Sequence, residues 1–287
     1  MLNGKKVTMD KSNNDLLKLN LSNLKKKSTA PLELVFDYTL PLQITNKKIE
    51  PFFISSADNF YPRPARNGKN DFRVTFNIKV ETPEKLNVVS QGEKLSDFVK
   101  NSNRTVIWRE NKPQEEIILI ADHYQVFTAS HQSISLYAYL HDNDKALAKK
   151  YFKATRSYID LYSKLIAPYP YKKFALVENS KQTGYGMPSF TLLGSRIIRF
   201  PFILQTSYPH EVLHNWFGNG VYIRPDSGNW AEGLTTYLAD HLLSAQRGKG
   251  GQYRFQELMK YSNYVNEKND FPLENFKGRD SMVSQAI

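Results

Sequence analysis

The chain of 287 residues contains no cysteine. This absence excludes disulfide bonds and every metal site that depends on thiolate ligands, and it leaves the redox compartment undecided. No stretch reaches the roughly 18 consecutive apolar residues that a membrane-spanning helix requires. Residues 1–6 also lack the apolar core of a signal peptide. We therefore expect no transmembrane segment, and the localisation and oligomeric state stay open.

Acidic residues are comparatively few, with 28 Asp and Glu against 39 Lys and Arg and a formal net charge of +11. Such an excess can attract nucleic acid or an anionic membrane. The basic residues are scattered, however, and only Lys25 to Lys27 form a run. A solvated surface explains this pattern better, so we expect no nucleic-acid partner.

Short segments with alternating apolar and polar residues run from Leu32 to about Tyr139, as in residues 72–80. Residues 116–121 and 134–140 are predicted to be the last strands of this part. Hydrophobic residues make up 40% of the chain, which is enough to bury a core for one domain and part of another. We predict a β-rich N-terminal domain over residues 1–141.

Helical spacing begins at residue 144 and continues to 166, just before Pro168, which disfavours helix in the residue that precedes it. Helical and strand patterns are mixed from there onward. The predicted fold class is α+β, with a mixed α/β domain over residues 142–287.

The sequence His210-Glu211-Val212-Leu213-His214 carries the clearest chemistry. Residues four apart on a helix lie about 40° apart around its axis, so both imidazoles can bind one cation. Glu211 lies beside that face. It can take a proton from a zinc-bound water, whose pKa the metal lowers to roughly 7. Glu211 is therefore the candidate general base.

A catalytic zinc ion needs a third protein ligand, and Glu232 is the candidate. It lies in a predicted helix over about 229–247, whose apolar residues recur at helical spacing. Gly218 and Asn219 are predicted to end the first helix, and residues 224–228 to form a turn between the two helices. The two helices can then face each other.

The run from His210 to Asn219, followed by Asn229-Trp230-Ala231-Glu232-Gly233 and Tyr237, resembles the aminopeptidase N family of zinc metallopeptidases. This gluzincin family includes leukotriene hydrolase, and the resemblance covers about residues 168–287. It implies that His210, His214 and Glu232 bind one zinc ion and that Glu211 is the general base. It also implies a saddle-like antiparallel β-sheet domain before a thermolysin-like catalytic domain, with peptides as substrates.

Two departures from the family pattern concern spacing and length. The family usually has one residue more between the second histidine and the glutamate ligand, and a shorter loop at Pro225 to Gly228 would absorb the difference. The family's Tyr-x-Lys-Gly motif, whose tyrosine hydrogen-bonds the developing oxyanion, has no counterpart. By the family register it would lie just beyond Ile287, so we expect the chain to be a fragment, truncated at the C-terminal end of its catalytic domain.

A third departure lies in the segment Gly184-Tyr185-Gly186-Met187-Pro188-Ser189. It corresponds to the family's Gly-x-Met-Glu-Asn edge strand, whose glutamate holds the substrate's α-amino group. Gly186 and Met187 are the predicted substrate-binding residues that remain, and an edge strand can still pair with a peptide backbone. Glu178 could supply the missing carboxylate, or it could be a solvated residue at a strand end.

Three functional hypotheses follow. The favoured one is a zinc metallopeptidase, most simply an aminopeptidase. The alternatives are a non-catalytic zinc-binding scaffold with a degenerate anchoring motif and a hydrolase acting on a non-peptide ligand such as a lipid epoxide. The remaining motif residues are expected to serve structure. His123, His131 and His141 should form ordinary hydrogen bonds, His241 should lie on the opposite face of its helix, and Trp216, Phe217 and Trp230 should pack around the metal helices.

Overall fold

A computed structural model describes residues 9–11, 17–19, 33–41, 43–45, 48–63, 73–180, 184–224, 226–279 and 281–286. Some residues named in the sequence predictions lie outside these ranges, so those predictions have no structural counterpart. They are residues 1–6, the lysine run 25–27, Leu32, Phe72, Pro225 and Ile287. Among the described residues no helix is both long enough and apolar enough to cross a bilayer.

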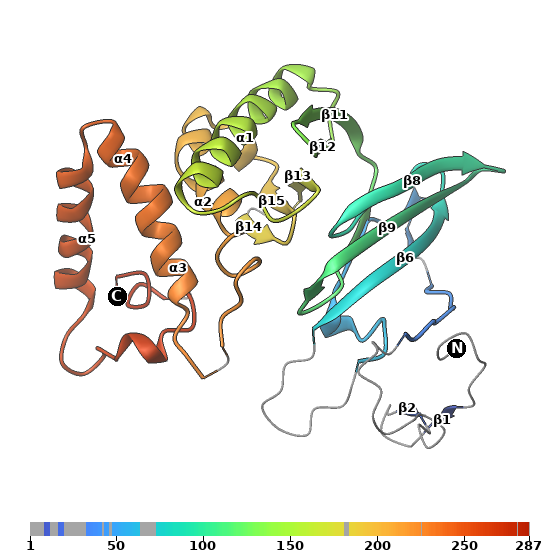
Figure 1. The fold of residues 1–287 in the computed structure, drawn as a ribbon, viewed down its shortest axis with the longest axis horizontal. Helices are drawn as coiled ribbons and strands as arrows, with labels where there is room; N and C mark the ends of the chain where they lie inside the picture. The colour runs from blue at the N-terminus through green and yellow to red at the C-terminus, as the bar shows by residue number, and fades with distance from the viewer. Residues whose placement is uncertain are drawn as a thin grey trace.

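The N-terminal half is built from antiparallel strands (Figure 1). The larger three-stranded sheet has the order β6-β9-β8, and a second has the order β5-β10-β7. Their bounds are Val74–Pro83 (β6), Glu93–Lys100 (β8), Asn103–Gln114 (β9), Phe52–Ile54 (β5), Asn87–Val89 (β7) and Leu119–Asp122 (β10). Two short pairs precede them: β1 (Met9–Lys11) with β2 (Leu17–Leu19), and β3 (Ile44–Thr45) with β4 (Lys48–Ile49). Strand β6 alternates between half-buried and exposed residues, as its sequence predicts.

The C-terminal half contains a mixed five-stranded sheet of order β11-β12-β13-β15-β14. Its strands are Gln125–His131 (β11), Ile134–Leu140 (β12), Lys173–Asn179 (β13), Gly184–Met187 (β14) and Phe190–Gly194 (β15). Strand β13 is parallel to both neighbours, and β14 is an antiparallel edge strand. The mixed α+β class is therefore confirmed, whereas the saddle and thermolysin-like labels stay predictions.

The two sides of β13 explain its continuous apolar sequence. Phe174 and Leu176 pack under the helices α1 (Lys145–Leu165) and α2 (Ser207–Leu213), whereas Ala175 and Val177 pack with Ile118 and other residues of the N-terminal half. The five-stranded sheet is thus covered on both faces, by helices on one and by the N-terminal strands on the other.

Residues 134–140 form a strand as predicted, but it does not pair with the N-terminal sheets. Strand β12 pairs with β11 and with β13, so it belongs to the C-terminal sheet. An alternating apolar pattern identifies a strand but not its partner, which is chosen by contacts distant in sequence. The change from one set of sheets to the other falls between β10 and β11, and the domain limit at residue 141 stays a prediction.

Helices follow the sequence signals closely. Helix α1 (Lys145–Leu165) begins at Asp144, whose side chain accepts a hydrogen bond from the Leu147 amide at 2.8 Å, and it ends before Pro168. The remaining helices are α2 (Ser207–Leu213), α3 (Trp230–Thr235), a π-helical turn (Thr236–His241), α4 (Leu242–Gln246) and α5 (Gly250–Tyr264). Short 3-10 turns cover Ser56–Asp58, Ile197–Arg199, Pro201–Gln205 and Leu273–Asn275.

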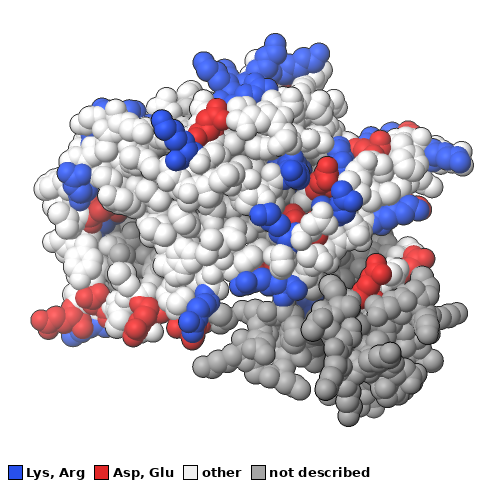
Figure 2. Space-filling view, viewed as in Figure 1, with Lys and Arg blue, Asp and Glu red and all other residues white. Residues whose placement is uncertain are grey.

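Charge is distributed over the visible face without one dominant patch. Lys and Arg side chains there are interspersed with Asp and Glu (Figure 2). This arrangement agrees with a solvated surface, and the expectation of no nucleic-acid partner stays a prediction.

Candidate metal centre

Helix α2 brings the two histidines together. His210 lies in its last turn and His214 directly follows it with helical backbone angles, so the two ring centroids are 4.9 Å apart. The helix ends at Leu213 rather than at the predicted Gly218. Asn215 donates from its side chain to the Val212 carbonyl at 2.9 Å, which ends the helix earlier than a glycine signal alone would.

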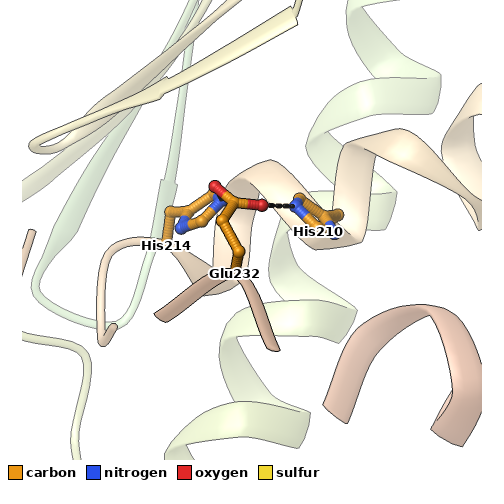
Figure 3. A group of neighbouring side chains, drawn as sticks. All are labelled: His210, His214 and Glu232. Carbon is orange, nitrogen blue, oxygen red and sulfur yellow. Dashed lines mark ion pairs between the residues drawn. The ribbon is translucent and has the colours of Figure 1, made fainter. Parts of the chain in front are cut away.

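Glu232 reaches this pair from helix α3. The side chain of Asn229 caps that helix by accepting a hydrogen bond from the Glu232 amide at 3.4 Å. The carboxylate then lies 3.4 Å from His210 Nε2 and 3.3 Å from His214 Nε2 (Figure 3). One ligand atom from each of the three residues lies within 4.8 Å of the others. The predicted ligand set therefore converges, even though the residues come from two helices.

The outer nitrogen of each imidazole is also occupied. His210 Nδ1 lies 3.1 Å from the Asp240 carboxylate, and His214 Nδ1 lies 3.1 Å from the Phe217 carbonyl oxygen. An Nδ1–H that donates outward leaves the Nε2 lone pair directed at the cluster. Two imidazoles, once deprotonated at Nε2, and one carboxylate form a donor set that suits a catalytic zinc ion. The residues present therefore fit this metal.

The electrostatics of the cluster favour positive charge. Burial by itself would raise the pKa of Glu232, but hydrogen bonds with His210 and His214 hold it well below the usual range of a glutamate. Burial opposes the charged form of His210, yet hydrogen bonds to Asp240 and Glu232 raise its pKa to about 9. A cation at this position would meet carboxylates on two sides.

Glu211 lies between this cluster and the edge strand β14. A Cβ atom added to Gly186 would be 3.0 Å from Glu211 Oε2, and one added to Gly184 would be 3.2 Å from Oε1. Burial raises the pKa of Glu211, and the nearby His214 and His210 limit the rise. The carboxylate also lines a cleft of about 870 Å³ together with the three candidate ligands and residues 184–186. Glu211 thus faces the cleft with raised proton affinity, as a general base requires.

Gly186 allows the strand to approach the helix, so Gly186→Ala is expected to disturb the site. The added Cβ would be 2.9 Å from His214 Cβ as well as 3.0 Å from the Glu211 carboxylate. We expect a loss of about 1–3 kcal/mol in the free energy of unfolding, as for an overpacked core, measured by chemical denaturation.

Gly233→Ala provides the matched control. Gly233 is exposed on helix α3, and a Cβ there would meet nothing within 4 Å. This change should stabilise the protein by up to about 1 kcal/mol, because alanine favours helix. Equal stability changes in the two variants would contradict the close approach at Gly186.

The residues that replace the family's anchoring pair have structural roles. Pro188 and Ser189 form the tight turn between β14 and β15, where Ser189 has a φ of 66° and is fully buried. Its amide donates to Asn215 Oδ1 at 2.8 Å, and its hydroxyl accepts from the Gly92 amide at 3.0 Å. Met187, at the end of β14, packs against the core instead of lining the cleft.

Glu178 does not lie in the site. It is 1% exposed, and its carboxylate accepts hydrogen bonds from Arg199 Nη1 at 2.6 Å and from the His141 amide at 2.8 Å. It does not line the cleft. Both predicted roles are therefore wrong: the carboxylate is neither solvated nor open to a substrate amine, because it is buried against a guanidinium.

His123, His131 and His141 form the ordinary contacts expected of them, and the predicted face of His241 stays a prediction. His123 contacts the Ile49 carbonyl oxygen, His131 contacts Asp160, His141 contacts Asp122, and His241 contacts Arg254. Trp216 is 4% exposed and donates to the Ala167 carbonyl at 2.7 Å, as expected of a core residue.

Two residues that help to build the site were missed in the sequence. Asp240 contacts His210, and Asn219 donates from its side chain to the Gly186 carbonyl at 2.9 Å. The sequence pattern predicts only a helix end at Asn219, and Asp240 lies off the Glu232 face of a regular helix.

Comparison with known proteins gives a likeness of fold. No protein-family model matches the sequence, and no curated protein matches it either. The M1 zinc metallopeptidase of Deinococcus radiodurans superimposes with a TM-score of 0.54 at 17% sequence identity, over 74% of this chain and 49% of that one. A mutant M1 zinc metallopeptidase from the same organism, bound to a Tyr-Ser-Ala substrate, gives 0.52 at 16% identity, over 71% and 47%.

The chain shares its fold with M1 zinc metallopeptidases. It spans about half the length of these structures. This likeness of fold agrees with the family resemblance found in the sequence.

Proposed function

We propose that this chain carries the site of a zinc metallopeptidase that hydrolyses peptide bonds. The observation that carries the proposal is the convergence of His210, His214 and Glu232 beside Glu211 in one cleft. The fold shared with M1 zinc metallopeptidases, one of them bound to a Tyr-Ser-Ala substrate, supports peptides as the substrate class.

Each residue has a defined task in this proposal. His210, His214 and Glu232 would hold one zinc ion, which when bound would polarise the scissile carbonyl and acidify water. Glu211 would take the proton of the attacking water and pass a proton to the leaving amine. The edge strand β14 would align the peptide through main-chain hydrogen bonds.

The predicted aminopeptidase mode needs a group that binds the substrate's free amine. Pro188 and Ser189 form a turn, and Glu178 is buried against Arg199, so none of these three can do so. In the cleft as described, Asp240 and Glu257 are the acidic residues beyond Glu211 and Glu232, and both have partners, His210 and Lys260. We infer that recognition rests mainly on the peptide backbone.

A free-amine peptide and its acetylated twin should therefore be hydrolysed at similar rates. The products would be identified by mass spectrometry, with and without a zinc chelator, and the chelator should abolish both reactions. A loss of more than about 100-fold on acetylation, which exceeds about 2.7 kcal/mol, would instead indicate an amine anchor and an aminopeptidase. Zinc-dependent peptide binding without cleavage would favour the scaffold alternative, which the altered anchoring residues motivate.

A further inference from the structure

Asp240 fixes the orientation of one candidate zinc ligand. Its Oδ2 atom lies 3.1 Å from His210 Nδ1, and the two side chains are 20% and 10% exposed. The opposite ring nitrogen, Nε2, faces Glu232. When the ring is neutral, a hydrogen bond from Nδ1–H to Asp240 selects one tautomer and one orientation, which favour metal binding through Nε2. His214 is held by a backbone carbonyl instead, so Asp240 acts on His210 alone.

The position of Asp240 depends on an irregularity in its helix. In a regular α-helix the seventh residue after Glu232 returns to within about 20° of the Glu232 direction, and the eighth lies about 80° away. Asp240 is the eighth, and Ala239 is the seventh. A regular helix would therefore direct Ala239, not Asp240, at the cluster.

The π-helical turn over Thr236–His241 changes this phase. Such a turn accommodates one extra residue, so the following residues are rotated back by about 100°. Asp240 then comes to within about 20° of the Glu232 direction, while Ala239 is fully buried in the core under the sheet. The contact between Asp240 and His210 therefore depends on the π turn.

We propose that Asp240 is a positioning residue for the metal centre and that the π turn directs its carboxylate toward His210. The inference rests on the proposed zinc site. An outer carboxylate of this kind typically changes metal affinity by about 10- to 100-fold.

The first test measures zinc affinity of the whole chain by competition with a chromogenic chelator. Asp240→Asn should weaken binding by about 10- to 100-fold, because the amide can no longer accept strongly from the imidazole. Glu257→Gln is the matched control, since Glu257 lines the same cleft but pairs with Lys260 at 2.7 Å. Its affinity should equal that of the wild type. Equal affinities in wild type and Asp240→Asn would overturn the proposal while leaving the zinc site intact.

A second readout does not require metal. NMR of the histidine ring nitrogens in the metal-free protein, recorded above the His210 pKa of about 9 so that the ring is neutral, should show His210 protonated at Nδ1 in the wild type and a mixture of tautomers in Asp240→Asn. An unchanged tautomer would overturn the positioning role. If the two proteins differ in tautomer as expected but the wild type binds no zinc, the proposed function alone would be refuted.

Deletion of Tyr237 tests the π turn itself. Tyr237 is 61% exposed within that turn, and its removal makes Asp240 the seventh residue after Glu232. A regular α-helix should then carry the carboxylate to the same place, so zinc affinity should stay near the wild-type value. Circular dichroism and thermal unfolding would verify folding. A folded deletion variant with the affinity of Asp240→Asn would overturn the role assigned to the extra residue.

Discussion

Glu211→Gln is expected to lower kcat/KM for peptide hydrolysis by about 100- to 10,000-fold, the usual contribution of general acid–base catalysis. Glutamine fills the same space beside Gly184 and Gly186 but cannot take a proton from water at neutral pH. Glu211 is absent from the converging ligand set, so zinc content should be unchanged. The measurements are steady-state kinetics and metal analysis of the same preparation.

Glu211→Asp sharpens this test. It keeps a carboxylate but withdraws it from the cleft by one methylene, so its activity should fall between those of the wild type and Glu211→Gln. Unaltered hydrolysis by the glutamine variant, with zinc retained, would show that the proton is taken by another group and would remove Glu211 from the mechanism.

Glu232→Ala is expected to abolish both zinc binding and hydrolysis. The carboxylate lies 3.4 Å from one imidazole nitrogen and 3.3 Å from the other, and it is the acidic ligand of the set. Removing it leaves two neutral donors, so the loss of affinity should exceed the about 10- to 100-fold typical of an outer-sphere change.

Thermal unfolding with and without zinc provides the readout. A ligand at about 100 times its Kd stabilises the native state by about 2.7 kcal/mol, so the wild type should unfold at a higher temperature with zinc present. Glu232→Ala should show no zinc-dependent shift, while its metal-free unfolding should remain cooperative. A full zinc shift in this variant would contradict the assigned ligand set.

The site was predictable where it depends on spacing within one element. The four-residue separation of His210 and His214 follows from helix geometry, and Asn229 marks the start of the helix that presents Glu232. Helix α1 was likewise marked by Asp144 at its start and Pro168 after its end. Such signals act over a few residues and survive in any tertiary context.

Other features depend on partners far along the chain. The sequence predicts that Glu178 is either a substrate anchor or a solvated residue. In the fold its carboxylate is buried and accepts hydrogen bonds from Arg199 and the His141 amide. The sequence pattern of strand β12 is compatible with either half of the chain, and its pairing with β13 places it in the C-terminal sheet. In both cases a local pattern fits several partners, and only packing selects one.

By itself, therefore, the sequence determined the helical spacing of His210 and His214, the place of Glu211 beside them, the capped helix that carries Glu232, and the alternation of strands such as β6. Tertiary structure alone decided which carboxylates face the two histidines. The π turn rotated Asp240 toward His210, and burial against Arg199 removed Glu178 from the cleft. The reason is physical: helix and strand periods are fixed by local backbone geometry, whereas the environment of a carboxylate depends on which distant charges and donors the fold places beside it.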